Sequence, residues 1–172
     1  MHFYYNQFLV SESGNFIDKT FTVLADLILK ILPTTEADKK AFAYYRSGMA
    51  AQEQGKYAEA LLNYYKALHF EENPTDRSYI LYNIGIIHQN VGDFVKALSF
   101  YEESLELNSF LPQALNNMAV IYHFIGKKEF ENSNYEISTD NFRKSASLWR
   151  RAIKISPNSY VEAQNWLKIN NL

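Results

Sequence analysis

Four histidines are the side chains in this sequence best suited to ligate a metal or to transfer protons. Two imidazoles that share a metal on one helix are commonly spaced by three or four residues. No two histidines here have that spacing; they are His2, His69, His88 and His123. The sequence also has no glycine-rich phosphate loop, nucleophile elbow or HExxH motif. An enzyme is therefore not predicted, and His88 is expected to pack in the core.

The carboxylates and the lack of cysteine lead to the same expectation. The adjacent pairs Glu71–Glu72 and Glu102–Glu103 fall on predicted helix surfaces, where a solvated face explains them. The absence of cysteine excludes disulfides, thiolate nucleophiles and sulfur-ligated metals. We expect no catalytic residues, no metal, no cofactor and no small-molecule substrate.

Composition and charge favour a folded protein. The chain has 172 residues, 47% of them hydrophobic, and a net charge of −2 without a basic block, so nucleic acid is not an expected partner. The most apolar run, 21–32, contains Asp26 and Lys30 and is shorter than the roughly 20 residues of a membrane span. No secretory signal or transit peptide is recognised, so the protein is expected to work where it is made.

Helical periodicity covers almost the whole chain, and Gly and Pro separate the helical segments. We predict a helix over 15–32, three antiparallel helix pairs and a last helix over 159–169. The predicted pairs are 36–54 with 56–71, 76–91 with 93–108, and 110–126 with 139–156.

An internal repeat explains this spacing. Residues 81–98 read LYNIGIIHQNVGDFVKAL and residues 44–61 read YYRSGMAAQEQGKYAEAL, which share Tyr, Gly, Gln, Gly and Ala-Leu at the same offsets. The small residues Gly48, Gly85 and Ala119 and the turn glycines match the 34-residue tetratricopeptide helix–turn–helix. The sequence therefore predicts an all-α fold, a short right-handed α-solenoid whose stacked repeats share a core.

The expected organisation is a tail over 1–14, an amphipathic helix over 15–33, repeats over 41–74, 78–111 and 112–159, and a capping helix over 160–172. A polar insertion at about 127–140 is expected to separate the two helices of the third repeat. Gly126 aligns with Gly92, so Gly126 is expected to end the first of these helices.

The first helix of each repeat is expected to line a concave groove. The residues predicted to face it are Tyr45, Met49, Tyr79, Tyr82, Asn83, Ile86, Gln113, Asn116, Asn117 and Val120. Asn83 and Asn117 occupy the same offset, and their carboxamides, which donate and accept, can hold a peptide backbone or tie neighbouring helices together. Both roles remain open.

Some tetratricopeptide co-chaperones grip the C-terminal carboxylate of heat-shock proteins, and this chain resembles them in fold. They use Lys and Arg at offsets that are Tyr45, Met49, Gln113 and Asn117 here. The carboxylate clamp is thus not expected in this chain.

The helix over 15–32 has its own apolar stripe, which includes Phe21, Leu24, Ile28 and Ile31. An amphipathic helix buries such a stripe, so the segment is expected to cap the first repeat. The alternative is attachment to a membrane surface or to a partner's groove; with only Lys19 and Lys30 on this helix, membrane affinity would depend on apolar burial.

A closer resemblance rests on GNFIDKTF (14–21), ILPTT (31–35), DRSYILYNIGIIH (76–88), FLPQALNNMAVIYH (110–123) and EAQNWLKI (162–169). In order and over residues 14–169, these segments resemble the chloroplast-encoded photosystem I assembly factors, which are three-repeat tetratricopeptide proteins. The resemblance implies a non-enzymatic, chaperone-like scaffold that is peripheral on the stromal side of the chloroplast thylakoid membrane. The implied partners are photosystem I subunits such as PsaA and PsaD. A general tetratricopeptide adaptor for another multisubunit complex is the alternative.

Overall fold

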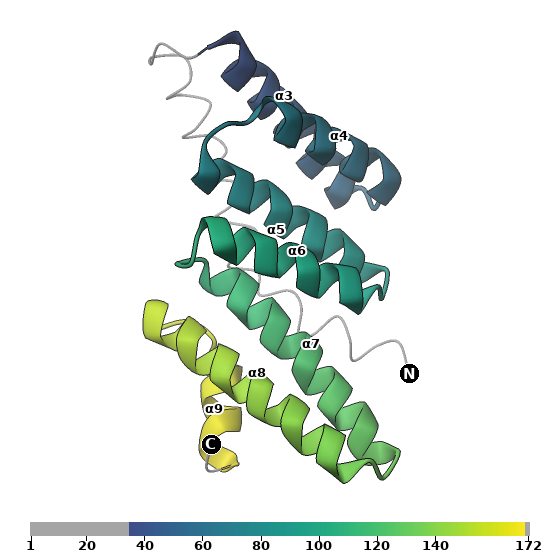
Figure 1. Cartoon of the computed structure of the whole chain (residues 1–172), viewed down its shortest axis with the longest axis vertical. Coiled ribbons are helices and arrows are strands. Elements are labelled where there is room, and N and C mark those ends of the chain that lie inside the picture. The colour runs from purple at the N-terminus through teal and green to yellow at the C-terminus, as the bar shows by residue number, and fades with distance from the viewer. Residues whose placement is uncertain (1–34, 171–172) are drawn as a thin grey trace.

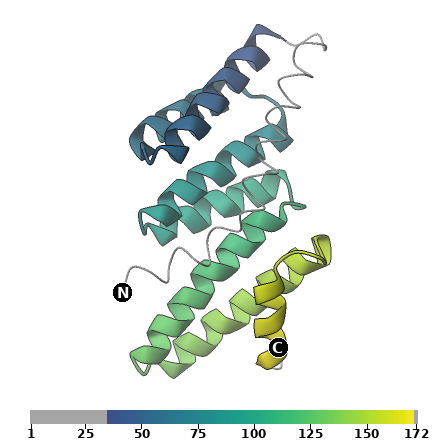
Figure 2. The ribbon, with the colours of Figure 1, turned by 180° about the vertical axis from the view of Figure 1, so that it is seen from behind.

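The computed structural model describes residues 35–170, and every regular element in that range is an α-helix. The helices are α3 (Glu36–Glu53), α4 (Tyr57–Phe70), α5 (Pro74–Asn90), α6 (Phe94–Leu107), α7 (Pro112–Glu131), α8 (Tyr135–Ile155) and α9 (Val161–Ile169). Successive helices form three antiparallel hairpins stacked along the long axis, and α9 lies against α8 (Figures 1 and 2). The predicted all-α fold is confirmed, whereas the predicted helix over 15–32 lies outside the described residues.

Side-chain caps determine where α3 and α5 begin, which are the first helices of the first and second hairpins. At α3, Thr35 Oγ1 accepts from the Asp38 amide at 3.1 Å, and Asp38 Oδ2 accepts from the Thr35 amide at 2.8 Å. This reciprocal capping box satisfies two amides that the helix itself leaves unpaired. At α5, Asn73 Oδ1 accepts from the Thr75 amide at 2.8 Å, and Pro74 occupies the first helical turn, where its missing N–H costs nothing.

Glycine lets the two helices of a hairpin approach each other closely. A Cβ atom on Gly48 would lie 2.6 Å from the Tyr64 ring, and one on Gly85 would lie 2.6 Å from the Tyr101 ring. Both tyrosines are fully buried. The small residues that the repeat pattern identifies therefore provide space for an aromatic ring of the second helix.

The third hairpin differs from the prediction. The segment 127–140 was expected to separate two helices, but α7 continues to Glu131 and α8 already begins at Tyr135. The extra residues lengthen both helices instead of forming a separate polar insertion. Only Asn132–Asn134 connects them, with Ser133 in the left-handed region at φ 64.

Gly126 accordingly has a different role from the one its alignment predicted. Gly92 is a turn glycine with φ +82, whereas Gly126 is buried inside α7, where a Cβ would lie 2.9 Å from the Phe142 ring. Gly126 and Phe142 are 16 positions apart, as Gly85 and Tyr101 are. The lengthened hairpin thus contains one more glycine–aromatic contact of the kind found in the first two.

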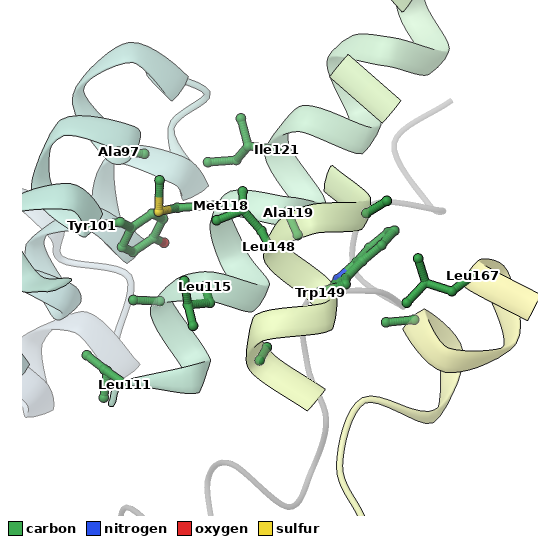
Figure 3. Packing of buried hydrophobic residues seen from close by; sticks show 14 residues of the cluster. Ala97, Tyr101, Leu111, Leu115, Met118, Ala119, Ile121, Leu148, Trp149 and Leu167 are labelled. Carbon is green, nitrogen blue, oxygen red and sulfur yellow. The ribbon is translucent and has the colours of Figure 1, made fainter. Parts of the chain in front are cut away.

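Two buried clusters continue across the junctions between hairpins. One cluster joins α3 and α4 to α5, and the other joins α6, α7, α8 and α9. In Figure 3, Met118 of α7 reaches toward the Tyr101 ring of α6, while Trp149 of α8 points toward Leu167 of α9. Each hairpin therefore completes the core of its neighbour, as expected for stacked repeats.

Side-chain hydrogen bonds join neighbouring helices, both at a junction between hairpins and within a hairpin. Arg77 of α5 donates through Nη1 to the carbonyl oxygens of Leu68 at 2.7 Å and Glu71 at 2.8 Å, at the end of α4. Ser104 Oγ of α6 donates to the Ser78 carbonyl of α5 at 2.8 Å, and both residues are fully buried. Because the bonds to Arg77 join α4 to α5, they fix the second hairpin against the first.

Candidate protein-binding face

The ten residues predicted to line a groove come from α3, α5 and α7, and we call their surface the Tyr–Asn face. They are Tyr45, Met49, Tyr79, Tyr82, Asn83, Ile86, Gln113, Asn116, Asn117 and Val120. Nine of the ten are half-buried, and Gln113 is exposed. Each of these nine side chains therefore has one part against the protein and another part open to solvent.

Asparagine–tyrosine hydrogen bonds connect the three helices of this face. Asn83 of α5 donates through Nδ2 to the Tyr45 hydroxyl of α3 at 3.0 Å. One repeat later, Asn117 of α7 donates through Nδ2 to the Tyr82 hydroxyl of α5 at 3.4 Å. The two carboxamides therefore tie neighbouring repeats together, which was one of the two roles left open by the sequence.

A second layer of hydrogen bonds supports the tyrosines from inside the hairpins. The Tyr101 hydroxyl donates to Gln89 Oε1 at 2.7 Å and accepts from Asn117 Nδ2 at 3.3 Å. Tyr64 makes the equivalent bond to Gln52 at 2.8 Å. Burial raises the pKa of Tyr101 well above its usual range, and the nearby Tyr82 hydroxyl adds to the rise, so Tyr101 is a neutral structural donor.

These glutamines were not among the predicted site residues. Gln52 and Gln89 occupy the same offset in the first two repeats, and that coincidence was the available signal. Asn116 was predicted, but its partner was not: Asn116 Oδ1 accepts from Trp149 Nε1 of α8 at 3.1 Å. The sequence does not indicate which distant residue a glutamine or tryptophan side chain will hydrogen-bond.

The remaining members of the face provide apolar and amide surface. Met49, Tyr79, Ile86 and Val120 pack beside the buried clusters. Within residues 35–170, neither these four nor Gln113 forms a side-chain hydrogen bond. None of the ten residues is charged, so the face lacks the cations that a carboxylate clamp requires.

Packing explains His88, whereas His69 is exposed in the last turn of α4. His88 is half-buried and stacks on Phe100 with ring centroids 5.3 Å apart. Burial lowers the pKa of His88, although Asp93, 3.8 Å away, acts in the opposite direction. No group of three or more histidine and acidic side chains that could hold a metal occurs in the described part of the chain.

Four residues were predicted to attach the N-terminal helix to a membrane or to a partner. Phe21, Leu24, Ile28 and Ile31 lie outside the described residues. Among helices α3 to α9, none combines the length and the apolar character that crossing a bilayer requires.

Comparisons with known proteins agree with this architecture. A model of the tetratricopeptide repeat matches residues 78–110. A solved structure titled "First TPR of Spaghetti (RPAP3) bound to HSP90 peptide SRMEEVD" is 22% identical with a TM-score of 0.54, covering 76% of this chain and 90% of that one. This likeness supports the tetratricopeptide fold of the described helices.

Two curated relatives are much more similar in sequence. The photosystem I assembly protein Ycf3 of Rippkaea orientalis is 59% identical over 92% of this chain and 91% of its own length. That of Cyanophora paradoxa is 58% identical over 91% of both chains. The chain therefore belongs to the Ycf3 family of photosystem I assembly proteins.

Proposed function

We propose that this chain acts in photosystem I assembly as a non-enzymatic, chaperone-like scaffold that holds unassembled subunits on its Tyr–Asn face. The observation that carries the proposal is the character of that face: half-buried aromatic, aliphatic and amide side chains, and not one charged residue. Such a surface excludes water from an apolar segment without requiring a charged partner.

The same character favours one class of ligand. Tyrosine and the aliphatic residues Ile86 and Val120 provide contact area, and the exposed Gln113 carboxamide can donate to and accept from a peptide backbone. We infer that the ligand is an uncharged, largely apolar segment of a subunit that has not yet found its place in the complex.

Comparison with the solved tetratricopeptide domain sharpens this inference. The peptide in that structure, SRMEEVD, contains three acidic residues. In this chain the positions expected to supply a clamp are Tyr45, Met49, Gln113 and Asn117, which cannot neutralise carboxylates. A related fold that presents uncharged residues is suited to a different kind of segment, because specificity follows the side chains of the site.

We propose PsaA and PsaD as partners, and a peripheral position on the stromal side of the thylakoid membrane, from the resemblance to the family. A large membrane subunit has the apolar segments that an uncharged face would cover before assembly. Binding of PsaD would show whether the Tyr–Asn face also accepts a subunit that does not enter the bilayer.

A charge introduced into the face tests the proposal. The variant Ile86→Glu/Val120→Glu places two carboxylates on the Tyr–Asn face. The matched control, Leu62→Glu/Val95→Glu, makes the same change of charge at side chains that are 55% and 82% exposed. We expect the first variant to lose capture of newly made PsaA and PsaD from solubilised membranes, because burying an unpaired charge is costly, and the control to retain it.

Circular dichroism and thermal melts establish that both variants are folded. Equal capture by both folded variants would contradict the assigned face. Capture of unrelated apolar peptides with the same affinity as photosystem I segments would instead indicate a general adaptor.

A further inference from the structure

The outer surface of α8 carries a concentration of positive charge that the proposed function does not use. Among residues 141–155, six side chains are exposed: Ser147 and five cations. The cations, which we call the α8 basic strip, are Arg143, Lys144, Arg150, Arg151 and Lys154. No carboxylate occurs in this stretch, although the chain as a whole has a net charge of −2.

Helix geometry aligns these side chains. Arg143, Arg150 and Lys154 follow one another after seven and four residues, so they form a row about 16 Å long on one side of the helix. Leu148 and Trp149 are buried in the core cluster and lie on the opposite side of the helix. Because that buried side packs against α7, the row of Arg143, Arg150 and Lys154 points away from the helix that contributes to the Tyr–Asn face, while Lys144 lies nearer to α7.

Most of this charge is not neutralised within the protein. Arg143 forms an exposed ion pair with Asp140 at 3.3 Å, and Lys144 lies over the Tyr122 ring at 5.4 Å. Glu102 of α6 is near that ring, where its charge adds to the rise that burial causes in the pKa of Tyr122.

The other three cations, Arg150, Arg151 and Lys154, form no ion pair or side-chain hydrogen bond with any residue in the range 35–170. They are exposed on a helix whose other side is firmly packed. Their charge is therefore available to a partner of opposite sign.

We propose that the α8 basic strip binds the surface of an anionic lipid bilayer. Clusters of Lys and Arg on an amphipathic helix are attracted to anionic headgroups. A specific protein partner would be expected to contact apolar or aromatic anchors at the centre of the interface, but the exposed large apolar side chains of α8, Tyr135 and Ile137, lie at its N-terminal end, before the strip begins. A bilayer surface requires no such anchor.

This inference rests on the peripheral membrane position proposed above, and it names the surface and the lipid chemistry responsible. It also gives the protein an orientation. With the strip on the bilayer, the Tyr–Asn face is directed elsewhere, so membrane binding and subunit binding can occur together.

Vesicle binding by the full chain tests the proposal. The probes are phosphatidylcholine vesicles with about one-third phosphatidylglycerol, and vesicles of phosphatidylcholine alone. The strip variant is Arg150→Gln/Arg151→Gln/Lys154→Gln, and the control is Lys56→Gln/Lys127→Gln/Lys128→Gln, which removes the same charge from exposed positions elsewhere.

Each cation near an anionic surface contributes about fivefold in affinity, so the strip variant should bind anionic vesicles about 100-fold more weakly. The control should bind nearly as tightly as the unaltered chain. Binding should also disappear when salt is raised to about 1 M, where the screening length falls to about 3 Å.

Three results would overturn the proposal: equal losses in the two variants, equal binding to neutral vesicles, or no binding of the unaltered chain to anionic vesicles. Tight binding of poly-glutamate without vesicle binding would assign the strip to an acidic protein and would also overturn it. Capture of PsaA by the strip variant is measured in parallel, since retained capture separates failure of this inference from failure of the proposed function.

Discussion

The ring of Tyr101 packs directly on the backbone of Gly85, so closely that a Cβ on Gly85 would lie 2.6 Å from ring carbon Cε1. Tyr101 is fully buried and its hydroxyl is held by Gln89, so the ring cannot easily move aside. The glycine and the tyrosine thus set the distance between α5 and α6. Gly48 and Tyr64 do the same in the first hairpin.

Gly85→Leu should therefore destabilise the protein. Overpacking of a tight core costs about 1–3 kcal/mol, and in a chain of this size each kcal/mol lowers the melting temperature by about 2–4 °C. Thermal melts of Gly85→Leu and of Ser99→Leu, an exposed position on the partner helix, provide the comparison. A melting temperature unchanged in the glycine variant would contradict the close approach of these helices.

The repeat pattern could be predicted from the sequence because each small residue is paired with a neighbour at a fixed distance. Gly48 and Gly85 follow one pattern, and both pack against a tyrosine 16 positions later. The third hairpin escaped the prediction because Gly126 was aligned with the turn glycine Gly92, although it is a contact glycine like Gly85. Its polar segment, 127–140, has turn-like residues but continues both helices, and the competition between local propensity and the packing of Phe142 on Gly126 is decided only in three dimensions.

The hydroxyl of Tyr101 should contribute to stability, because the group that accepts its hydrogen bond, Gln89 Oε1, is buried. Tyr101→Phe removes the donor that satisfies Gln89, whose side chain is only 4% exposed. An unsatisfied buried polar group costs about 1–3 kcal/mol. In Tyr64→Phe the equivalent acceptor, Gln52, is half-buried and water can replace the hydroxyl, so we expect the smaller loss.

Urea denaturation measures the free energy of unfolding of both tyrosine variants. The expected order is unaltered chain, then Tyr64→Phe, then Tyr101→Phe. The reverse order would show that burial of the glutamine does not determine the cost.

His123 makes stability depend on pH. Its ring lies against Phe142, Trp149 and Trp166, with centroids 5.2–5.5 Å away. Burial lowers the pKa of His123 below its ordinary value of 6.5, and Lys127 adds to the effect. The folded state thus favours neutral imidazole, and as the pH falls through 6.5 the unfolded chain takes up a proton first.

Stability should accordingly decrease as the pH is lowered from neutral through this range. His123→Phe, which preserves an aromatic ring, should reduce the slope of unfolding free energy against pH. His88 acts in the same direction because burial also lowers its pKa, so the slope should vanish only when both histidines are replaced. A slope unaffected by His123→Phe would exclude this histidine as its source.

The Tyr–Asn face shows the other limit of sequence reasoning. Placing Asn83 and Asn117 on one surface required only the repeat offset, but their hydrogen-bond partners are on other repeats, 38 and 35 positions away. Such long-range pairs depend on the crossing of the helices. The sequence therefore predicted a shared offset for the two asparagines, while the structure was needed to show that their carboxamides tie neighbouring repeats together.

Gly126 offers a direct choice between the sequence alignment and the structure. If Gly126 ended a helix as Gly92 does, asparagine would be tolerated at both positions, because asparagine adopts left-handed backbone angles more readily than other residues with a side chain. Of these two glycines, Gly92 alone has a positive φ, and its Cβ direction is open. A Cβ on Gly126 would instead lie 2.9 Å from the Phe142 ring and 3.2 Å from the Ser138 carbonyl oxygen. Gly92→Asn should thus cost less than about 1 kcal/mol, and Gly126→Asn about 1–3 kcal/mol. Urea denaturation measures the free energy of unfolding of the two variants. An equally small decrease in both would mean that the helices of the third hairpin are shorter than the structure has them.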